Sequence, residues 1–297
     1  MSALAGRTAV VSGGARGLGR AIAEALIAAG ATVTIVDSGV EINGDRADPG
    51  VVEATAAAIG ARGLALSIAS AAAAEQAVPE RIDILVHAAA ILRDGFVFKA
   101  DPFDVDAVLR TSLHGGFYLT RAVAERLRAQ AKHRGGQWPN GRIIHLISTA
   151  GLYGNYGQAA YAAAKAGLVG LMRATALDLQ RIGVTANCVA PFGATRVTES
   201  IRPQTPAQEA YKAAALRVPS ADVGALVAWL ASDEAGGVSG QIFGVRGREV
   251  MLFNQARPIA RAVVRRAAPL GPQLAGFIEH LTPLETDLDA FSGDPLI

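Results

Sequence analysis

Tyr161 and Lys165 stand four residues apart in an alanine-rich stretch, and this spacing suggests chemistry. Residues four apart lie on one face of a helix, so the phenol and the ammonium are expected to be close together. A nearby positive charge favours the phenolate and lowers the pKa of tyrosine from its ordinary value of about 10. Tyr161 is therefore predicted to act as general acid and base on a carbinol oxygen, which Ser148, at the end of a strand-like run, would hold.

A second chemical feature is the run SGGARGLG, which lies between an apolar, strand-like stretch and a stretch of helical periodicity. Glycines let the backbone turn sharply and approach a pyrophosphate, and a helix N-terminus presents free N–H groups to it. In this strand–turn–helix context the run predicts a dinucleotide-binding site. The predicted contacts within the run are Ser12, Gly13, Arg16, Gly17, Leu18 and Gly19.

The predicted cofactor is NAD, because Asp37 ends the next strand-like run, 18 residues after Gly19. A carboxylate at this point can accept both ribose hydroxyls of NAD and would repel the extra phosphate of NADP. Arg16 favours NADP instead, since a cation beside the loop could bind that phosphate. We give the carboxylate more weight and expect NADP to be the less favoured cofactor.

Short apolar runs alternate with helical periodicity, which predicts a parallel sheet covered by helices on both faces. The expected strands are 8–11, 31–36, 82–86, 142–147, 183–189 and 241–245, and the expected long helices are 18–29, 103–130 and 158–180. The predicted fold class is α/β, with one doubly wound domain over residues 1–255. Residues 256–297 are predicted to form an extension that packs on the domain or on a partner subunit, with a short helix at 275–281.

Composition narrows the functional classes. A formal net charge of +2 gives no reason to expect nucleic acid as a partner, and charges or glycines interrupt every apolar tract before membrane-spanning length. The one cysteine, Cys188, excludes a disulfide within the chain and is predicted to be a buried strand residue. With no signal-peptide pattern after Met1, a cytoplasmic location is expected.

Taken together, the glycine-rich run, Ser148 before the Tyr161/Lys165 pair, and NCVAP at 187–191 resemble the short-chain dehydrogenase/reductase family over about residues 5–255. The resemblance implies one Rossmann-type domain with a seven-stranded sheet, and a homodimer or homotetramer. It implies that Tyr161 transfers the proton, that Lys165 binds the nicotinamide ribose and tunes Tyr161, and that Ser148 orients the substrate. Stretches at 90–94, 141–144, 152–158 and 227–230 are similar to the (3R)-hydroxyacyl-CoA dehydrogenase module of peroxisomal multifunctional enzymes.

Several positions depart from the family pattern. His87-Ala-Ala-Ala90 replaces an Asn-Asn-Ala-Gly motif whose asparagines brace the sheet, and Ser112 replaces a fourth catalytic residue, an asparagine that relays a proton through a water. By position, the match implies further cofactor contacts at Ser67, Ile68, Ala88, Ala89, Ala90 and Pro191. His87 and His114 are interpreted as structural histidines, and no metal site is expected, because no second ligand has suitable spacing.

The function that these features predict is an NAD(H)-dependent oxidoreductase that interconverts a secondary alcohol and a ketone. The expected substrate is a 3-hydroxyacyl-CoA or 3-oxoacyl thioester, and the alternative is a hydroxysteroid or another bulky cyclic alcohol. A different class stays open: a non-catalytic relative that keeps the fold for binding or assembly.

Two further groups of residues lie outside the motifs. Tyr153, Tyr156 and Phe192 are predicted to lie on the substrate side, with loop packing as an equally good interpretation of the two tyrosines. A basic group in the extension, Arg257, Arg261, Arg265 and Arg266, could meet CoA phosphates or an acidic neighbour, although a solvated face is the favoured interpretation.

Overall fold

The computed structural model describes residues 2–195, 198–199, 202–263, 265, 269–286, 291 and 294–297. Its centre is an eight-stranded sheet with the strand order β3-β2-β1-β4-β5-β6-β7-β8. The strands are β1 (Thr8–Ser12), β2 (Thr32–Asp37), β3 (Arg62–Ala65), β4 (Ile84–His87), β5 (Arg142–Leu146), β6 (Thr185–Phe192), β7 (Ile242–Arg246) and β8 (Glu249–Leu252). The predicted α/β class with a doubly wound sheet is confirmed.

The first seven strands are parallel, as expected. The apolar runs located six of them, the resemblance implied a seventh, which is β3, and β8 was not anticipated. β8 is antiparallel to β7 and is joined to it by a tight turn at Gly247, whose φ is +60°. A two-strand hairpin needs only such a turn, whereas parallel neighbours need a helical crossover. The eighth strand therefore extends the seven-stranded sheet that the resemblance implies, without another helix.

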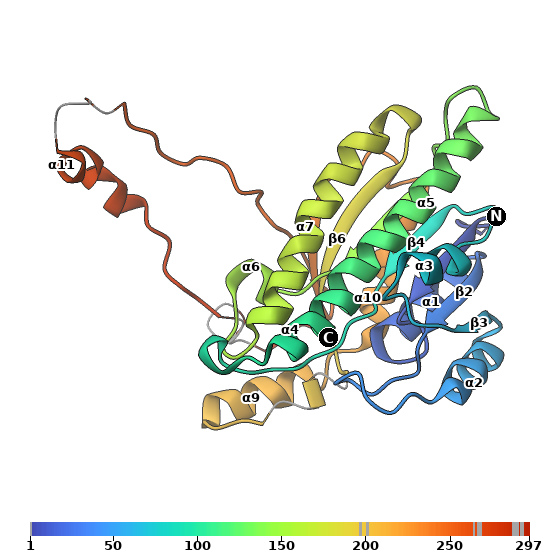
Figure 1. Cartoon of the computed structure of the whole chain (residues 1–297), viewed down its shortest axis with the longest axis horizontal. Helices are drawn as coiled ribbons and strands as arrows, with labels where there is room; N and C mark the ends of the chain where they lie inside the picture. The colour runs from blue at the N-terminus through green and yellow to red at the C-terminus, as the bar shows by residue number, and fades with distance from the viewer. Residues whose placement is uncertain are drawn as a thin grey trace.

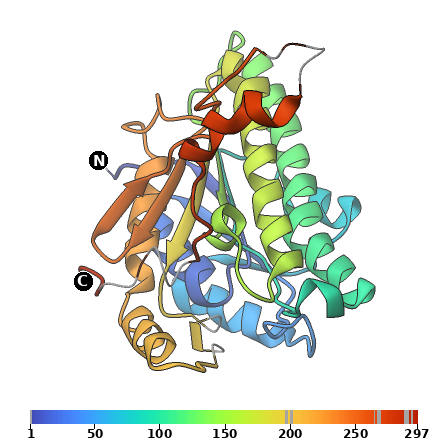
Figure 2. The same ribbon diagram turned by 90° about the vertical axis from the view of Figure 1, so that its left-hand side faces the viewer.

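Helices cover both faces of the sheet (Figure 1). One face carries α1 (Gly17–Ala28), α2 (Pro49–Ile59) and α10 (Ser220–Ala231), whose apolar residues join one core cluster. The other face carries α3 (Ala71–Ala77), α5 (Gly115–Lys132) and α7 (Ala159–Leu179). In Figure 2, α5 and α7 run side by side along this face. Within β1, Val10 belongs to the second cluster and Val11 to the first, as the alternation of a pleated strand requires.

The prediction of a single helix over 103–130 is wrong. The structure has α4 (Pro102–Leu109), a π-helical segment η2 (Arg110–His114) and then α5. A π turn holds an extra residue and changes the direction of backbone carbonyls, which periodicity in the sequence does not report. Gly116 shows how closely the chain packs there, because a Cβ at this residue would lie 2.8 Å from the His87 ring.

The remaining helical segments are short or peripheral. They are η1 (Val97–Lys99), α6 (Ala150–Tyr153), η3 (Gln180–Ile182), α9 (Pro206–Ala215), α11 (Leu270–Leu274) and η4 (Ala275–His280). In the described part of the chain, no single helix is long and apolar enough to cross a membrane; only the bent pair α9 and α10 passes when taken together. Much of α10 is buried core against α1, which is the ordinary reason for such a composition.

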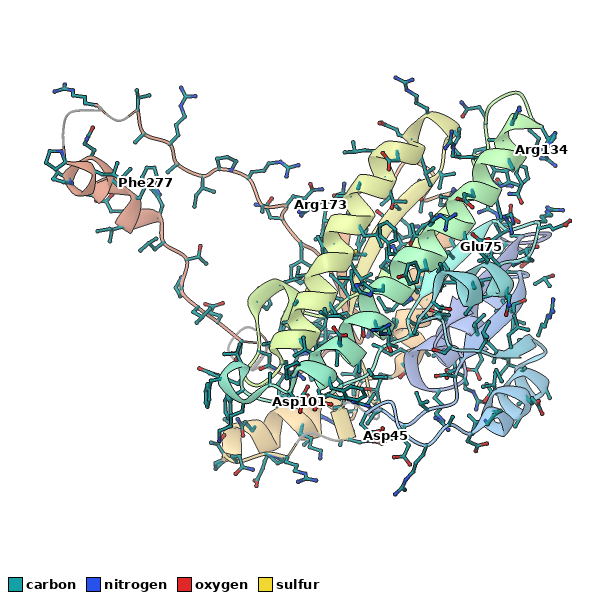
Figure 3. The ribbon with its side chains drawn as sticks, in the orientation of Figure 1. Asp45, Glu75, Asp101, Arg134, Arg173 and Phe277 are labelled. Atoms are coloured by element: carbon teal, nitrogen blue, oxygen red, sulfur yellow. The ribbon has the colours of Figure 1, made fainter. Side chains whose placement is uncertain are left out.

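The chain beyond β8 forms an arm, defined here as residues 254–286. The arm leads away from the sheet and carries α11 and η4 at its far end (Figure 1), where Phe277 is labelled in Figure 3. The last residues return to the domain: Arg248 N–H donates to the Leu296 carbonyl, and Arg217 pairs with Asp294. The short helix expected at 275–281 is the 3₁₀ segment η4. The boundary at residue 255 stays a prediction.

Candidate active site

A cavity of about 840 Å³ lies at the carboxyl ends of the parallel strands, where open α/β sheets bind their ligands. Most of the predicted cofactor residues line it. These are Gly13, Arg16, Gly17, Leu18, Gly19, Asp37, Ser67, Ile68, Ala88, Ala89, Ala90, Tyr161, Lys165 and Pro191. Ser12 lies behind this wall, fully buried, with its hydroxyl 2.8 Å from His87 Nδ1.

The glycine-rich turn opens onto one end of this cavity. A Cβ at Gly13 would lie 2.7 Å from the Ala89 nitrogen, so this position has no room for a side chain. Gly17, with φ of +51°, begins α1; no side chain of the described residues caps this helix, and its first turn holds no acidic residue. The free N–H groups at the helix N-terminus therefore suit an anion, and the turn fits the pyrophosphate of a dinucleotide.

Asp37 lies on the same wall, at the end of β2. Its two carboxylate oxygens accept hydrogen bonds from the backbone N–H groups of Ala15 (3.1 Å) and Gly39 (2.8 Å), which orient the carboxylate. Arg16 donates through one nitrogen to the carbonyls of Gly39 (3.2 Å) and Val40 (2.9 Å). This guanidinium is thus partly committed to the segment after β2.

Residues 38–48, the polar segment that follows β2, form a wall of the cavity through Val40, Glu41 and Ile42 among others. Arg93 ties this wall to α4: it donates to the Asn43 carbonyl (2.8 Å) and to the carboxylates of Asp104 (2.8 Å) and Asp45 (3.3 Å). The sequence analysis did not single out Arg93. The signal available was its place in the stretch 90–94, which already carried the family likeness.

Tyr161 and Lys165 both lie on α7 and line the same cavity. Lys165 is 2% exposed, its Nζ is 5.6 Å from the centroid of the Tyr161 ring, and it donates to the Leu146 carbonyl at 2.7 Å. Burial lowers the pKa of Lys165 to about 8. A buried ammonium beside the phenol is the arrangement that favours a phenolate.

Ser148 lies two residues beyond β5, and its Oγ accepts a hydrogen bond from the backbone of Ala150 at 3.1 Å. It is half-buried and stands outside the residues that line the cavity. Ser112, in η2, is fully buried, and its Oγ finds no hydrogen-bond partner among the described residues. The catalytic roles of Ser148 and Ser112 stay predictions.

Two histidines lie in the core, near enough to Lys165 for its charge to act on both. His87 on β4 and His145 on β5 are register partners, both fully buried, with ring centroids 5.9 Å apart. Burial is the largest cause that lowers the pKa of each, and it brings His87 to about 4. His114, by contrast, is exposed beside Tyr118. In the described part of the chain, no three His, Cys, Asp or Glu side chains are grouped to hold a metal.

Two of the residues predicted on the substrate side, Tyr153 and Phe192, belong to one group of aromatic side chains that stands outside the residues lining the cavity, so their role stays a prediction. Tyr153 contacts the rings of Phe253 (6.3 Å between centroids) and Phe291 (6.4 Å), and Phe291 meets Phe192 edge to face at 4.6 Å. These four residues are called the aromatic cluster below. Phe253 and Phe291 were not anticipated, since contacts this distant in sequence leave no local signal. Tyr156 stands apart, 81% exposed.

Comparisons with known proteins agree with this geometry. A family model described as Enoyl-(Acyl carrier protein) reductase matches residues 13–247. Hydroxyacyl-CoA dehydrogenase ChsB1 of Mycobacterium tuberculosis is 38% identical over 84% of this chain and 80% of that protein. The 3-oxoacyl-[acyl-carrier-protein] reductase FabG of Escherichia coli is 35% identical over 83% of this chain and 98% of its own length. The crystal structure of a short chain dehydrogenase from Mycobacterium avium matches with a TM-score of 0.75 and 30% identity, covering 95% of this chain and 98% of that one.

The closer likeness inferred from the sequence is also confirmed. Peroxisomal multifunctional enzyme type 2 of Mus musculus is 31% identical over 90% of this chain, which spans 35% of that longer protein. The matched region includes the glycine-rich turn, Asp37 and the Tyr161/Lys165 pair, so sequence and geometry point the same way. The chain belongs to the short-chain dehydrogenase/reductase family.

Proposed function

We propose that the protein is an NAD(H)-dependent oxidoreductase that interconverts a 3-hydroxyacyl thioester and the corresponding 3-oxoacyl thioester. The observation that carries the proposal is that one cavity is lined both by the N-terminus of α1, which no described side chain caps, and by Tyr161 beside a buried Lys165. The first suits a dinucleotide phosphate and the second suits proton transfer to an oxygen. The names of the relatives support thioesters as the substrate class.

In this proposal the bound nicotinamide supplies or accepts the hydride. Tyr161 gives its phenolic proton to the forming alkoxide during reduction and takes it back during oxidation. The Lys165 ammonium stabilises the phenolate that remains, and it would also reach the cofactor ribose. Ser148 holds the substrate oxygen near the phenol, and Ser112 belongs to the catalytic set by its position in the family pattern.

NAD is the proposed cofactor because Asp37 presents a carboxylate where the adenosine ribose would lie. Its oxygens are held by Ala15 and Gly39, so the carboxylate cannot turn away without losing two hydrogen bonds. Arg16, the cation that could favour NADP, already donates to two carbonyls. The 2′-phosphate of NADP would therefore meet a fixed negative charge.

The test is to follow absorbance of the reduced cofactor with NAD and NADP across 3-hydroxyacyl thioesters of CoA and of acyl carrier protein. A panel of hydroxysteroids covers the second candidate, which the broad aromatic cluster supports. We expect turnover with NAD and a 3-hydroxyacyl thioester. Turnover with steroids alone would overturn the substrate class, and the absence of saturable NADH fluorescence binding would leave the non-catalytic alternative.

A homodimer or homotetramer in the cytoplasm is part of the proposal. Large apolar side chains are exposed on the helices of one face, among them Phe103 (73%), Phe117 (52%) and Leu177 (74%). A second subunit would remove this surface from water. Light scattering on the purified full chain measures the subunit number, and a monomer at micromolar concentration would contradict the oligomer.

A further inference from the structure

A chain of buried hydrogen bonds runs through His87, a residue that the proposed reaction does not use. His87 Nδ1 is 2.8 Å from the Ser12 hydroxyl, and His87 Nε2 is 2.9 Å from the Ser112 carbonyl oxygen. Ser12 Oγ in turn accepts from the backbone N–H of Ala89 at 3.4 Å. One imidazole thus joins the glycine-rich turn, the cavity wall at Ala89 and the π-helical segment η2.

The chemistry of these partners sets the tautomer of His87. A carbonyl oxygen only accepts, so Nε2 must carry the proton that faces Ser112. In the neutral ring Nδ1 is then unprotonated and accepts from the Ser12 hydroxyl. In this form the ring offers one donor group and one acceptor group, as an asparagine amide does with its NH₂ and its carbonyl oxygen. His87 therefore supplies the hydrogen-bonding capacity of the asparagine that the family pattern has at this position.

The surroundings are shaped to this ring. Gly116, just after η2, has no side chain, and a Cβ there would lie 2.8 Å from His87 Cδ2 and 2.9 Å from Nε2. The neighbours of Ser112 in η2, Arg110 and Thr111, line the cavity. A displacement of the Ser112 carbonyl would therefore move a wall of the proposed active site.

We infer that His87 is a positioning residue, which holds the glycine-rich turn and η2 at a fixed separation below Lys165 by means of its neutral Nε2–H tautomer. The predicted fall in kcat rests on the proposed function, whereas the hydrogen-bonding role of His87 does not. Two charged or titratable groups face the ring among the described residues: Lys165 from α7 and His145 from β5. The Lys165 charge also lowers the pKa of His87, so the ring stays neutral while the lysine is protonated.

His145 provides a matched control. It lies in register with His87, at the same depth, and its one hydrogen bond in the described structure is a contact of 3.4 Å with Thr120. Removing either imidazole leaves a cavity of similar size, whereas only His87→Ala breaks the link between Ser12 and Ser112. His87→Asn keeps one donor and one acceptor.

The experiment compares His87→Ala, His87→Asn and His145→Ala in kcat, KM for the cofactor, the pH profile of kcat and the melting temperature. We expect His87→Ala to lower kcat by about 10- to 100-fold and to shift the pH profile, because misplacement of a catalytic wall is costly. His87→Asn should restore most of kcat, and His145→Ala should lower the melting temperature without moving the pH profile. Equal kcat and pH profiles in the two alanine variants would overturn the inference.

Two measurements keep the inference separate from other failures. A long-range ¹⁵N–¹H spectrum of the wild-type protein should show His87 protonated at Nε2 alone, whether or not the protein has turnover. A protonated Nδ1 would overturn the inference even if the proposed oxidoreductase activity is found. If His87→Ala does not fold, His87→Phe fills the space without hydrogen bonds, and full kcat in that variant would also overturn it.

Discussion

The two sides of the candidate active site differ in what holds their residues. On the side of the proposed proton transfer, Lys165 is 2% exposed and bonded to the Leu146 carbonyl, above two fully buried histidines. On the proposed substrate side, Tyr153 rests on two rings contributed by the last part of the chain, and Tyr156 is 81% exposed. The first arrangement is set by the core of the sheet, and the second by peripheral segments. The chemistry is therefore expected to be less tolerant of change than the substrate preference.

The largest effect that the comparison predicts is on the buried side. Tyr161→Phe removes the proposed proton donor and should lower kcat by about 10²- to 10⁴-fold, since this is the usual contribution of general acid–base catalysis. NADH affinity, measured by fluorescence titration, should stay within a few-fold of wild type. Tyr118→Phe makes the same chemical change on α5 and serves as the control. Comparable turnover of Tyr161→Phe and wild type would remove Tyr161 from the mechanism.

The buried histidines predict that stability depends on pH. His87 has a folded-state pKa of about 4 against an ordinary value of 6.5, so the unfolded chain binds a proton between these values and the folded chain does not. The free energy of unfolding should be highest above pH ~6.5 and fall as the pH drops toward 4, by about 3 kcal/mol for this group alone. Urea denaturation measures this loss.

Urea denaturation of His87→Asn at the same pH values isolates the contribution of His87 to the pH dependence of stability. The carboxylates, which also titrate in this range, are the same in the variant and in wild type. The variant should lose less stability between pH 6.5 and 4 than wild type does. Equal slopes in the two proteins would show that the folded-state pKa of His87 is not below its ordinary value of about 6.5.

A smaller effect is expected at the cofactor end of the cavity. Asp37→Ala removes the fixed negative charge and should reduce the preference for NAD over NADP by about tenfold in kcat/KM, which is a free-energy change of about 1.4 kcal/mol. Glu53→Ala, which removes an exposed carboxylate from α2, is the control. An unchanged cofactor ratio in Asp37→Ala would contradict the assignment of Asp37.

The smallest effect is predicted on the peripheral side. Phe291→Ala removes one ring from the aromatic cluster and should raise KM for bulky substrates by about 2- to 10-fold, in line with the usual value of an aromatic pair. Its KM for NAD should not change. Leu284→Ala, at an arm residue that is 93% exposed, is the control. If Phe291→Ala lowered kcat more than Tyr161→Phe does, the peripheral side would be the less tolerant of change, which would contradict the comparison between the two sides.

The sequence predicts the features that depend on local pattern. The alternation of apolar runs located most of the parallel strands, and the glycine-rich turn and Asp37 line the cavity as their spacing suggested. The break at η2 was not predictable, since a single helix and an interrupted one have nearly the same periodicity. This break lies just before Gly116, which packs against the ring of His87 on β4.

The substrate side was less predictable for the same reason. Tyr153 and Phe192 were named from the family pattern, but their partners Phe253 and Phe291 lie far along the chain. No local motif marks a residue that returns from an extension of this length. The hydrogen bonds of His87 were likewise hidden, because its partners Ser12 and Ser112 are distant in sequence and come together only in the folded sheet.

The two phenylalanines that flank the arm in the sequence, Phe253 and Phe291, both contact Tyr153. A segment whose two ends are already fixed together behaves as a closed loop, and doubling the length of a flexible loop costs only about 0.6 kcal/mol of closure entropy. Insertions, deletions or whole replacements between these two phenylalanines are therefore expected to change the stability of the sheet only slightly. The ring of Tyr153 thus marks a junction at which related chains can diverge in length while the domain keeps its stability.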